Sequence, residues 1–168
     1  MRVTDVHGHQ VEFLANFGSR FTGGEIRHMR EAWEDYFVRE RQAQLRNGVV
    51  WCCLTRALAV SHGTEPFFQC FGGEAIYMPL KEHPTIGLKL QSIGAPVIVE
   101  FSVSGKELAT FQQLSHVVLS RYHQTIRADA HSCEAEARVF RAIRPEEILA
   151  VTPLVDFEVA VGLSRQEG

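Results

Sequence analysis

The sequence predicts an α+β domain, because its 168 residues mix two kinds of apolar periodicity. Residues 22–45 and 104–122 carry apolar side chains at helical spacing behind capping-box sequences. Residues 49–55, 96–103 and 136–143 carry continuous or alternating apolar runs, which are typical of strands. A chain of this length is sufficient for a single domain with a substantial core.

Composition excludes several classes of protein. Apolar residues make up 45 % of the chain and charged residues 22 %, and the net charge is −3, so no large nucleic-acid footprint is expected. No apolar run is long enough to span a bilayer, and the first ten residues lack the apolar core of a signal peptide. The four cysteines form no C-x-x-C motif and are expected to be free thiols in a reducing cytoplasm. We therefore expect a cytoplasmic protein with no membrane partner.

The N-terminal third is predicted to be helical. His7 and His9 could share a metal if they lay on a strand, but no third ligand is nearby, and we predict no metal site. Thr22 and Glu25 form a capping box at the start of the helix over residues 22–45. The Asn47-Gly48 pair, whose residues tolerate positive φ, is expected to end this helical segment.

The run over residues 49–55 predicts a strand buried on both faces. Arg56 follows it, where it can bind an anionic ligand in a bidentate manner or lie on the surface as an ordinary arginine. Residues 57–62 predict a short helix that ends at Gly63. Gly72 and Gly73 predict a turn between two short strands, the second of which contains Tyr77 as a core residue or a ligand contact.

The C-terminal third carries a pair of carboxylates at the start of a strand. Glu134 and Glu136 are two positions apart, so in an extended chain they point to the same side, toward either a shared site or solvent. Pro145 predicts a turn after this strand, and residues 148–151 and 152–161 predict further strands.

The E-x-E sequence, the alternating strand, the Pro-Glu turn and the following apolar strand together resemble the catalytic-glutamate strand of the ADP-ribosyltransferase family. The resemblance is to the bacterial toxin-type members and to the poly-ADP-ribose polymerase branch. It implies an α+β core of split, mostly antiparallel β-sheets around an NAD cleft, with flanking helices. This core would cover residues 48–161, with residues 1–47 as an N-terminal helical segment of the same domain.

The resemblance also implies a role for individual residues. Glu136 matches the catalytic glutamate and Glu134 the first glutamate of the motif, which handles the acceptor. The FGGEAIYM segment is similar to the strand whose tyrosine, here Tyr77, stacks on the nicotinamide ring. The remaining expected contacts are Thr55 and Arg56 with NAD, and His123, Arg127 and His131 with the acceptor. Two features depart from the family: either Cys52-Cys53 or Thr55-Arg56 stands where the polymerase branch has His-Gly, and no Ser-Thr-Ser follows.

The expected function is therefore NAD-dependent mono-ADP-ribosyl transfer, toxin- or effector-like, to a protein or nucleic-acid acceptor. NAD would be a substrate, and a cognate antitoxin or immunity protein would be a further partner. Such a toxin would act in the cytoplasm of its own cell or of a target cell. Two alternatives remain open: a non-catalytic α+β interaction or immunity-type domain, and an RNase-like hydrolase that uses His123 or His131 with Glu136.

Overall fold

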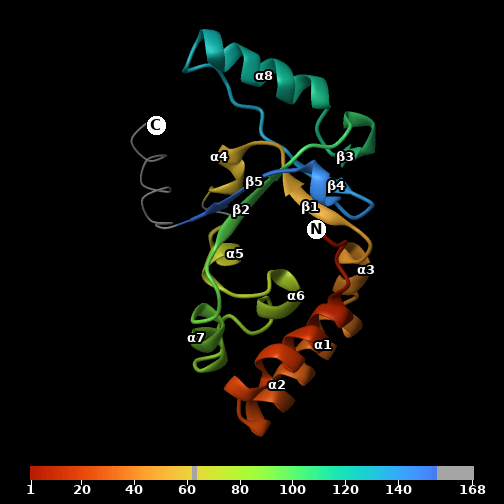
Figure 1. Cartoon of the computed structure of the whole chain (residues 1–168), viewed down its shortest axis with the longest axis vertical. Helices are drawn as coiled ribbons and strands as arrows, with labels where there is room; N and C mark the ends of the chain where they lie inside the picture. The colour runs from red at the N-terminus through yellow and green to blue at the C-terminus, as the bar shows by residue number, and fades with distance from the viewer. Residues whose placement is uncertain (62–63, 155–168) are drawn as a thin grey trace. The chain divides into compact units, whose positions relative to one another are not determined.

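The computed structural model describes residues 1–61 and 64–154 (Figure 1). Its contacts divide the chain into two compact units, which are described separately. The sheet unit contains residues 1–3 and the described parts of 49–64 and 98–168. The helical unit contains residues 4–48 and 65–97. Residues 65–97, which the family resemblance assigns to the transferase-like core, thus pack with the N-terminal helices.

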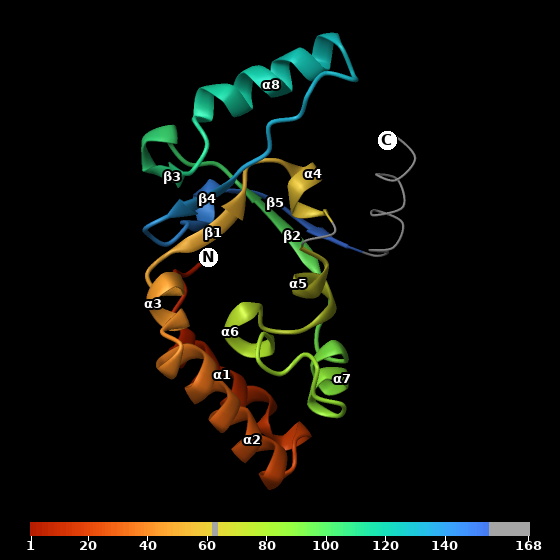
Figure 2. The same cartoon turned by 180° about the vertical axis from the view of Figure 1, so that it is seen from behind.

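The sheet unit is built on a three-stranded antiparallel sheet whose central strand is β4, Glu136–Val139. Strand β1, Val50–Cys53, pairs with one edge of β4, and β3, Leu108–Thr110, pairs with the other (Figure 2). The register sets Cys53 opposite Glu136 and Trp51 opposite Arg138. These pairings confirm the predicted strands at 49–55 and 136–143, and they show small antiparallel sheets within an α+β fold.

A second, two-stranded sheet joins β2, Val97–Phe101, to β5, Ile148–Pro153. The predicted turn at Pro145 is the 3-10 helix η5, Pro145–Glu147, which leads directly into β5. Val50, Val139 and Ile143 are buried between the elements of this unit, and apolar side chains from β2 and β5 pack against them. The inner face of the three-stranded sheet is therefore the core of this unit.

The second predicted helix begins later than expected. Ser104 and Glu107 do form a capping box, but it closes the 3-10 helix η4, Gly105–Glu107. The chain then enters β3, whose register pairs Leu108 with Val139, because pairing with an open edge of β4 outweighs local helical spacing. Helix α8 runs from Leu114 to Ile126.

Helices α1, Val6–Phe17, and α2, Gly23–Trp33, begin the helical unit. The capping box at the start of α2 is present as predicted, with the Thr22 and Glu25 side chains each bonded to the other's backbone N–H. The predicted long helix is interrupted by a π-helical segment, η2, Glu34–Arg39, and by the positive φ of 58° at Arg41 before α3, Gln42–Arg46.

Residues 65–91 contain three short helices, so the prediction of two strands around the glycine pair is wrong. The helices are α5, Glu65–Gln69, α6, Glu74–Tyr77, and α7, Ile86–Gln91. The predicted turn is confirmed by positive φ angles of 90° at Gly72 and 60° at Gly73. A short apolar run cannot be assigned to strand or buried helix from periodicity alone, and here the packing of the helical unit decides for helix.

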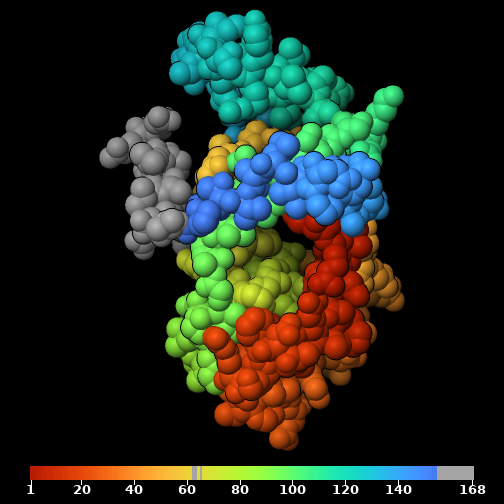
Figure 3. Space-filling view, in the orientation of Figure 1, coloured from red at the N-terminus to blue at the C-terminus, as the bar shows by residue number. Residues whose placement is uncertain are grey.

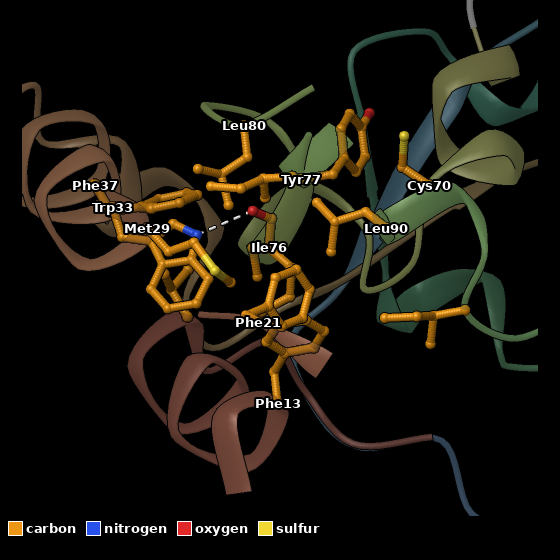
Figure 4. Packing of buried hydrophobic residues seen from close by; sticks show 14 residues of the cluster. Phe13, Phe21, Met29, Trp33, Phe37, Cys70, Ile76, Tyr77, Leu80 and Leu90 are labelled. Carbon is orange, nitrogen blue, oxygen red and sulfur yellow. Dashed lines mark hydrogen bonds between the residues drawn. The ribbon is translucent and has the colours of Figure 1, made fainter. Parts of the chain in front are cut away.

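The core of the helical unit is rich in aromatic residues (Figure 4). Trp33 is 4 % exposed and donates a hydrogen bond of 2.9 Å from its indole Nε1 to the carbonyl oxygen of Ile76. This bond joins α2 to α6 across the middle of the cluster and satisfies the only polar atom of the indole ring.

Within residues 1–61 and 64–154, no helix is both long and apolar enough to cross a bilayer. The predicted end of the short helix at His62 and Gly63 lies outside the described residues. So does most of the predicted last strand, of which Thr152 and Pro153 belong to β5. The short helix itself, α4, is described over Arg56–Ala59.

Candidate active site

The two carboxylates of the predicted site lie where β1 ends and β4 begins. The Thr55 hydroxyl donates a hydrogen bond of 2.9 Å to Oε2 of Glu134, and the Ser132 hydroxyl donates one of 3.0 Å to Oε1. The same Thr55 oxygen accepts a bond of 3.2 Å from the Leu58 N–H and so caps α4. Thr55 is a buried polar residue, 9 % exposed, and its hydroxyl both donates and accepts a hydrogen bond. Glu134 is thereby fixed in orientation at the end of the sheet.

Glu136 is the first residue of β4 and is exposed, on the face of the sheet opposite the core. Its partner in the strand register is Cys53. Next to this pair, the Leu54 N–H donates a hydrogen bond of 3.0 Å to the Ala135 carbonyl. No other described residue ties the Glu136 carboxylate by a hydrogen bond or an ion pair. The site thus contains one anchored carboxylate and one that is held only through its backbone.

The neighbouring thiols are kept protonated. Burial raises the pKa of Cys53, and the negative charges of Glu136 and Glu134 raise it further. Burial and the adjacent Cys53 raise the pKa of Cys52 to about 11. A thiol with a raised pKa is a poor nucleophile at neutral pH, so cysteine-based covalent catalysis does not suit this site. Both carboxylates thus lie close enough to Cys53 for their charges to raise its pKa.

Arg56 lies directly after Thr55, as the first residue of α4. Its Nη1 is 2.7 Å from Oε1 of Glu100 on β2, and the two side chains are 54 % and 43 % exposed. An exposed pair of this kind contributes little to stability, about 0–1 kcal/mol. An anionic ligand can therefore displace Glu100 from the guanidinium at small cost.

The three residues predicted to contact an acceptor lie near α8 and are exposed. His123 is on α8, and His131 follows it in the segment that leads to Glu134. Arg127 forms a bidentate pair with Asp129, at 2.7 Å and 3.0 Å, which raises the pKa of Arg127 and lowers that of Asp129. Its charge is thus compensated within the loop, and its acceptor role stays a prediction.

Ser120 fastens this segment to α8. Its hydroxyl donates a hydrogen bond of 2.8 Å to the His131 carbonyl and accepts one of 2.7 Å from the Cys133 N–H. Because Ser132 lies between these anchors and bonds to Glu134, the position of the anchored carboxylate is linked to α8.

Tyr77 is placed differently from the expectation. It ends helix α6 in the helical unit, is 1 % exposed, and meets Phe67 in a T-shaped contact with centroids 5.9 Å apart. Burial raises its pKa above the ordinary value. The segment is a helix rather than the predicted strand, and the nicotinamide-stacking role of Tyr77 stays a prediction.

The H-x-H pair also differs from a metal-binding strand, because His7 and His9 lie on helix α1. Residues two apart on a helix point to different sides. No group of three or more metal-ligating side chains occurs in the part of the chain that the structure describes.

The sequence analysis did not single out the group of residues around Arg138. The guanidinium carbon of Arg138 lies 5.2 Å from the ring centroid of Trp51, 5.3 Å from that of Phe111 and 5.7 Å from that of Phe140. The three rings are 40 %, 83 % and 61 % exposed. The available signal was an aromatic residue at an outward position within β1 and directly after β3 and β4, which stands out once the inward positions are assigned to the core.

Comparison of the chain with protein-family models, with curated proteins and with solved structures finds no match. The fold and the site thus define an α+β protein with small antiparallel sheets and with two carboxylates where β1 ends and β4 begins.

Proposed function

We propose that this chain is an NAD-dependent mono-ADP-ribosyltransferase of the toxin or effector kind, with a protein or nucleic-acid acceptor. One observation carries the proposal: β1 and β4 pair so that Glu134 bonds to Thr55, a residue 79 positions away. The pairing brings together Glu136, Thr55 and Arg56, for which the family resemblance implies contact with NAD, and Glu134, for which it implies handling of the acceptor. The antiparallel pairing of short strands in an α+β chain agrees with that family.

In the proposed reaction Glu136 is the catalytic residue. Its carboxylate accepts a hydrogen bond from a hydroxyl of the nicotinamide ribose and offsets the positive charge that develops as the bond to nicotinamide lengthens. An exposed carboxylate without a competing partner suits this task, because no existing bond must break before it meets the ribose. Arg56 contacts a phosphate or ribose in place of Glu100.

Glu134 has a positioning role in the proposal. Two hydroxyl donors hold it, so it presents a fixed negative edge beside Glu136 toward which an acceptor can be oriented. The enzyme would work in the cytoplasm of its own or a target cell, restrained by a cognate antitoxin or immunity protein.

The test is Glu136→Gln, which keeps the shape of the side chain and removes its charge. The purified parent and variant are incubated with labelled NAD and a cell lysate, and labelled acceptor and released nicotinamide are both measured. We expect the variant to lose roughly 100-fold or more of the rate, the usual cost of losing one electrostatic contact to a transition state. Because Glu136 is exposed and not tied to another side chain, the variant protein should unfold thermally at the same temperature as the parent.

The matched control is Glu146→Gln, the same change at a side chain that is 65 % exposed and lies in η5. It should leave both readouts unchanged. The proposal fails if the parent neither labels an acceptor nor releases nicotinamide, or if Glu136→Gln is as active as the parent. Nicotinamide release without labelling would define an NAD-hydrolysing enzyme instead of a transferase.

A second candidate, a non-catalytic interaction domain, is favoured by the exposed apolar side chains of α8, the helix coloured teal in Figure 3. Val118, Leu119, Tyr122 and Ile126 lie on one side of this helix and are 53–70 % exposed. Apolar side chains gathered on one exposed helix face are typical of protein contacts. Calorimetry with NAD separates the two candidates, because an interaction domain gives no heat of NAD binding.

A further inference from the structure

The outward face of the three-stranded sheet carries an aromatic group that the proposed transferase reaction does not use. Alternation along the strands directs Val50, Cys52, Ala137 and Val139 toward the core. The same alternation directs Trp51 on β1, Glu136 and Arg138 on β4, and Phe140 directly after β4, away from it. Phe111 follows β3 on this outward side, two residues after Ala109, the register partner of Arg138. We call Trp51, Phe111, Arg138 and Phe140 the aromatic platform.

The charge at the centre of the platform is held by aromatic rings and not by a carboxylate. Three ring centroids lie 5.2–5.7 Å from the guanidinium carbon of Arg138, within the range of a cation–π contact. Its Nε is shielded from solvent and has no acceptor among the described residues. Arg138 has no carboxylate partner there either, in contrast to Arg141, which is paired with Glu107 and Glu147. The platform therefore presents a positive charge with no carboxylate bonded to it, within an exposed aromatic surface.

We propose that the aromatic platform binds single-stranded RNA by stacking unpaired bases on its exposed rings. Bases stack on aromatic side chains and on arginine planes, and an exposed sheet face can offer several such planes side by side. The arginine also supplies the positive charge that a phosphate requires. A purely apolar protein partner would bury this charge without a counter-charge, at considerable cost.

Two features define the kind of strand. A single arginine in a chain of net charge −3 gives no long phosphate track, so bases and not phosphates must supply most of the binding energy. Glu136 lies on the same face as Arg138, and the Cα atoms of the two residues are roughly 7 Å apart along β4. A carboxylate repels phosphate but accepts a hydrogen bond from a ribose 2′-hydroxyl, which RNA has and DNA lacks. RNA binding does not depend on NAD or on transferase activity. The Glu136 carboxylate can accept a hydrogen bond from a ribose hydroxyl of either NAD or RNA.

The test measures binding of a fluorescein-labelled single-stranded RNA of mixed sequence to the full chain by anisotropy, without NAD. The same sequence as DNA and as an RNA duplex provides the comparison. We expect micromolar binding of the single strand, at least fivefold weaker binding of DNA, and at least tenfold weaker binding of the duplex, whose bases are already stacked. The salt slope, log K against log[salt], should be about −0.7 to −1.4, as one or two phosphate contacts predict.

Variants identify the surface. Phe111→Ala, at the most exposed ring, and Trp51→Ala should each weaken RNA binding about tenfold, the usual effect of losing one stacking partner. The control Phe67→Ala removes a ring that is 46 % exposed in the helical unit and should bind RNA like the parent. Circular dichroism establishes that each variant is folded.

A measurement on the unaltered protein avoids the question of folding. The chain has two tryptophans, Trp33 at 4 % and Trp51 at 40 % exposure, so iodide quenches mainly Trp51. Bound RNA should protect this fluorescence.

The inference is overturned by absence of RNA binding at about 100 µM protein, by equal affinity for DNA or duplex, by unchanged binding of Phe111→Ala and Trp51→Ala, or by unaltered iodide quenching. RNA binding is measured without NAD and transfer is measured without added RNA, so loss of transfer and loss of RNA binding are distinguishable.

Discussion

Thr55 and Glu134 share a hydrogen bond of 2.9 Å although they are 79 positions apart in the chain. The bond fastens the end of β1 to the start of β4, and the same hydroxyl caps α4. One side chain thus sets both the orientation of a carboxylate and the direction in which the chain leaves the sheet.

Thr55→Val should destabilise the protein by roughly 1–3 kcal/mol, because it removes a helix cap and a donor to a partly buried carboxylate while it preserves the shape of the side chain. Urea unfolding followed by circular dichroism measures this loss. Thr55→Ser keeps the hydroxyl and should recover most of the lost stability. Equal stability of Thr55→Val and the parent would contradict the role of this bond.

Gly72→Ala should destabilise the protein by about 2–4 kcal/mol. Gly72 has a φ of +90°, and an added Cβ would lie 2.4 Å from Cγ1 of the buried Ile76. Gly23→Ala is the matched control, because a Cβ there meets nothing within 4 Å in the first turn of α2. That change should stabilise the chain by about 0.5 kcal/mol. Thermal unfolding compares the two, and a Gly72→Ala protein as stable as Gly23→Ala would refute the assigned turn geometry.

The Glu25–Lys89 pair predicts a pH dependence. Lys89 Nζ lies 2.7 Å and 2.9 Å from the two oxygens of Glu25, and this contact, with the Thr22 N–H, lowers the pKa of Glu25 from 4.5 to about 2. A carboxyl whose pKa is lowered by folding stabilises the folded state above its unfolded pKa. That contribution is lost as the pH falls from about 4.5 to about 2.

The measurement compares the parent with Glu25→Gln by urea unfolding at pH values from 6 to about 2. The stability difference between them should be constant near neutral pH and should shrink across the acid window. In Lys89→Met, the Glu25 pKa followed by NMR titration should rise toward 4.5. A Glu25 that titrates near 4.5 in the parent would contradict this contact.

The sequence predicts well those elements whose signal is local. The alternation after Glu136 and the punctuation by Pro145 predict β4, η5 and β5 close to where they lie. The capping boxes at Thr22 and Ser104 are both formed. Side-chain to backbone bonds within four residues depend little on the rest of the fold, so their sequence patterns are informative.

The misses arise where distant contacts decide. The Ser104 box was expected to begin a helix, but Leu108 pairs with Val139 in the sheet. The segment around Tyr77 was expected to be a strand, but it packs as a helix among residues from α1 and α2. Trp51 lies in a run that predicted burial on both faces, yet it is exposed beside Arg138. Which face of an apolar run is covered depends on partners that its own residues do not specify.

The division of the chain has a practical consequence for anyone who wishes to study its parts. The polypeptide passes between the two units at residues 3–4, 48–49, 64–65 and 97–98. Neither unit is therefore a continuous stretch, and no single cut or terminal truncation releases one of them whole. Isolating either would require a redesigned gene in which the separate stretches are rejoined by new linkers.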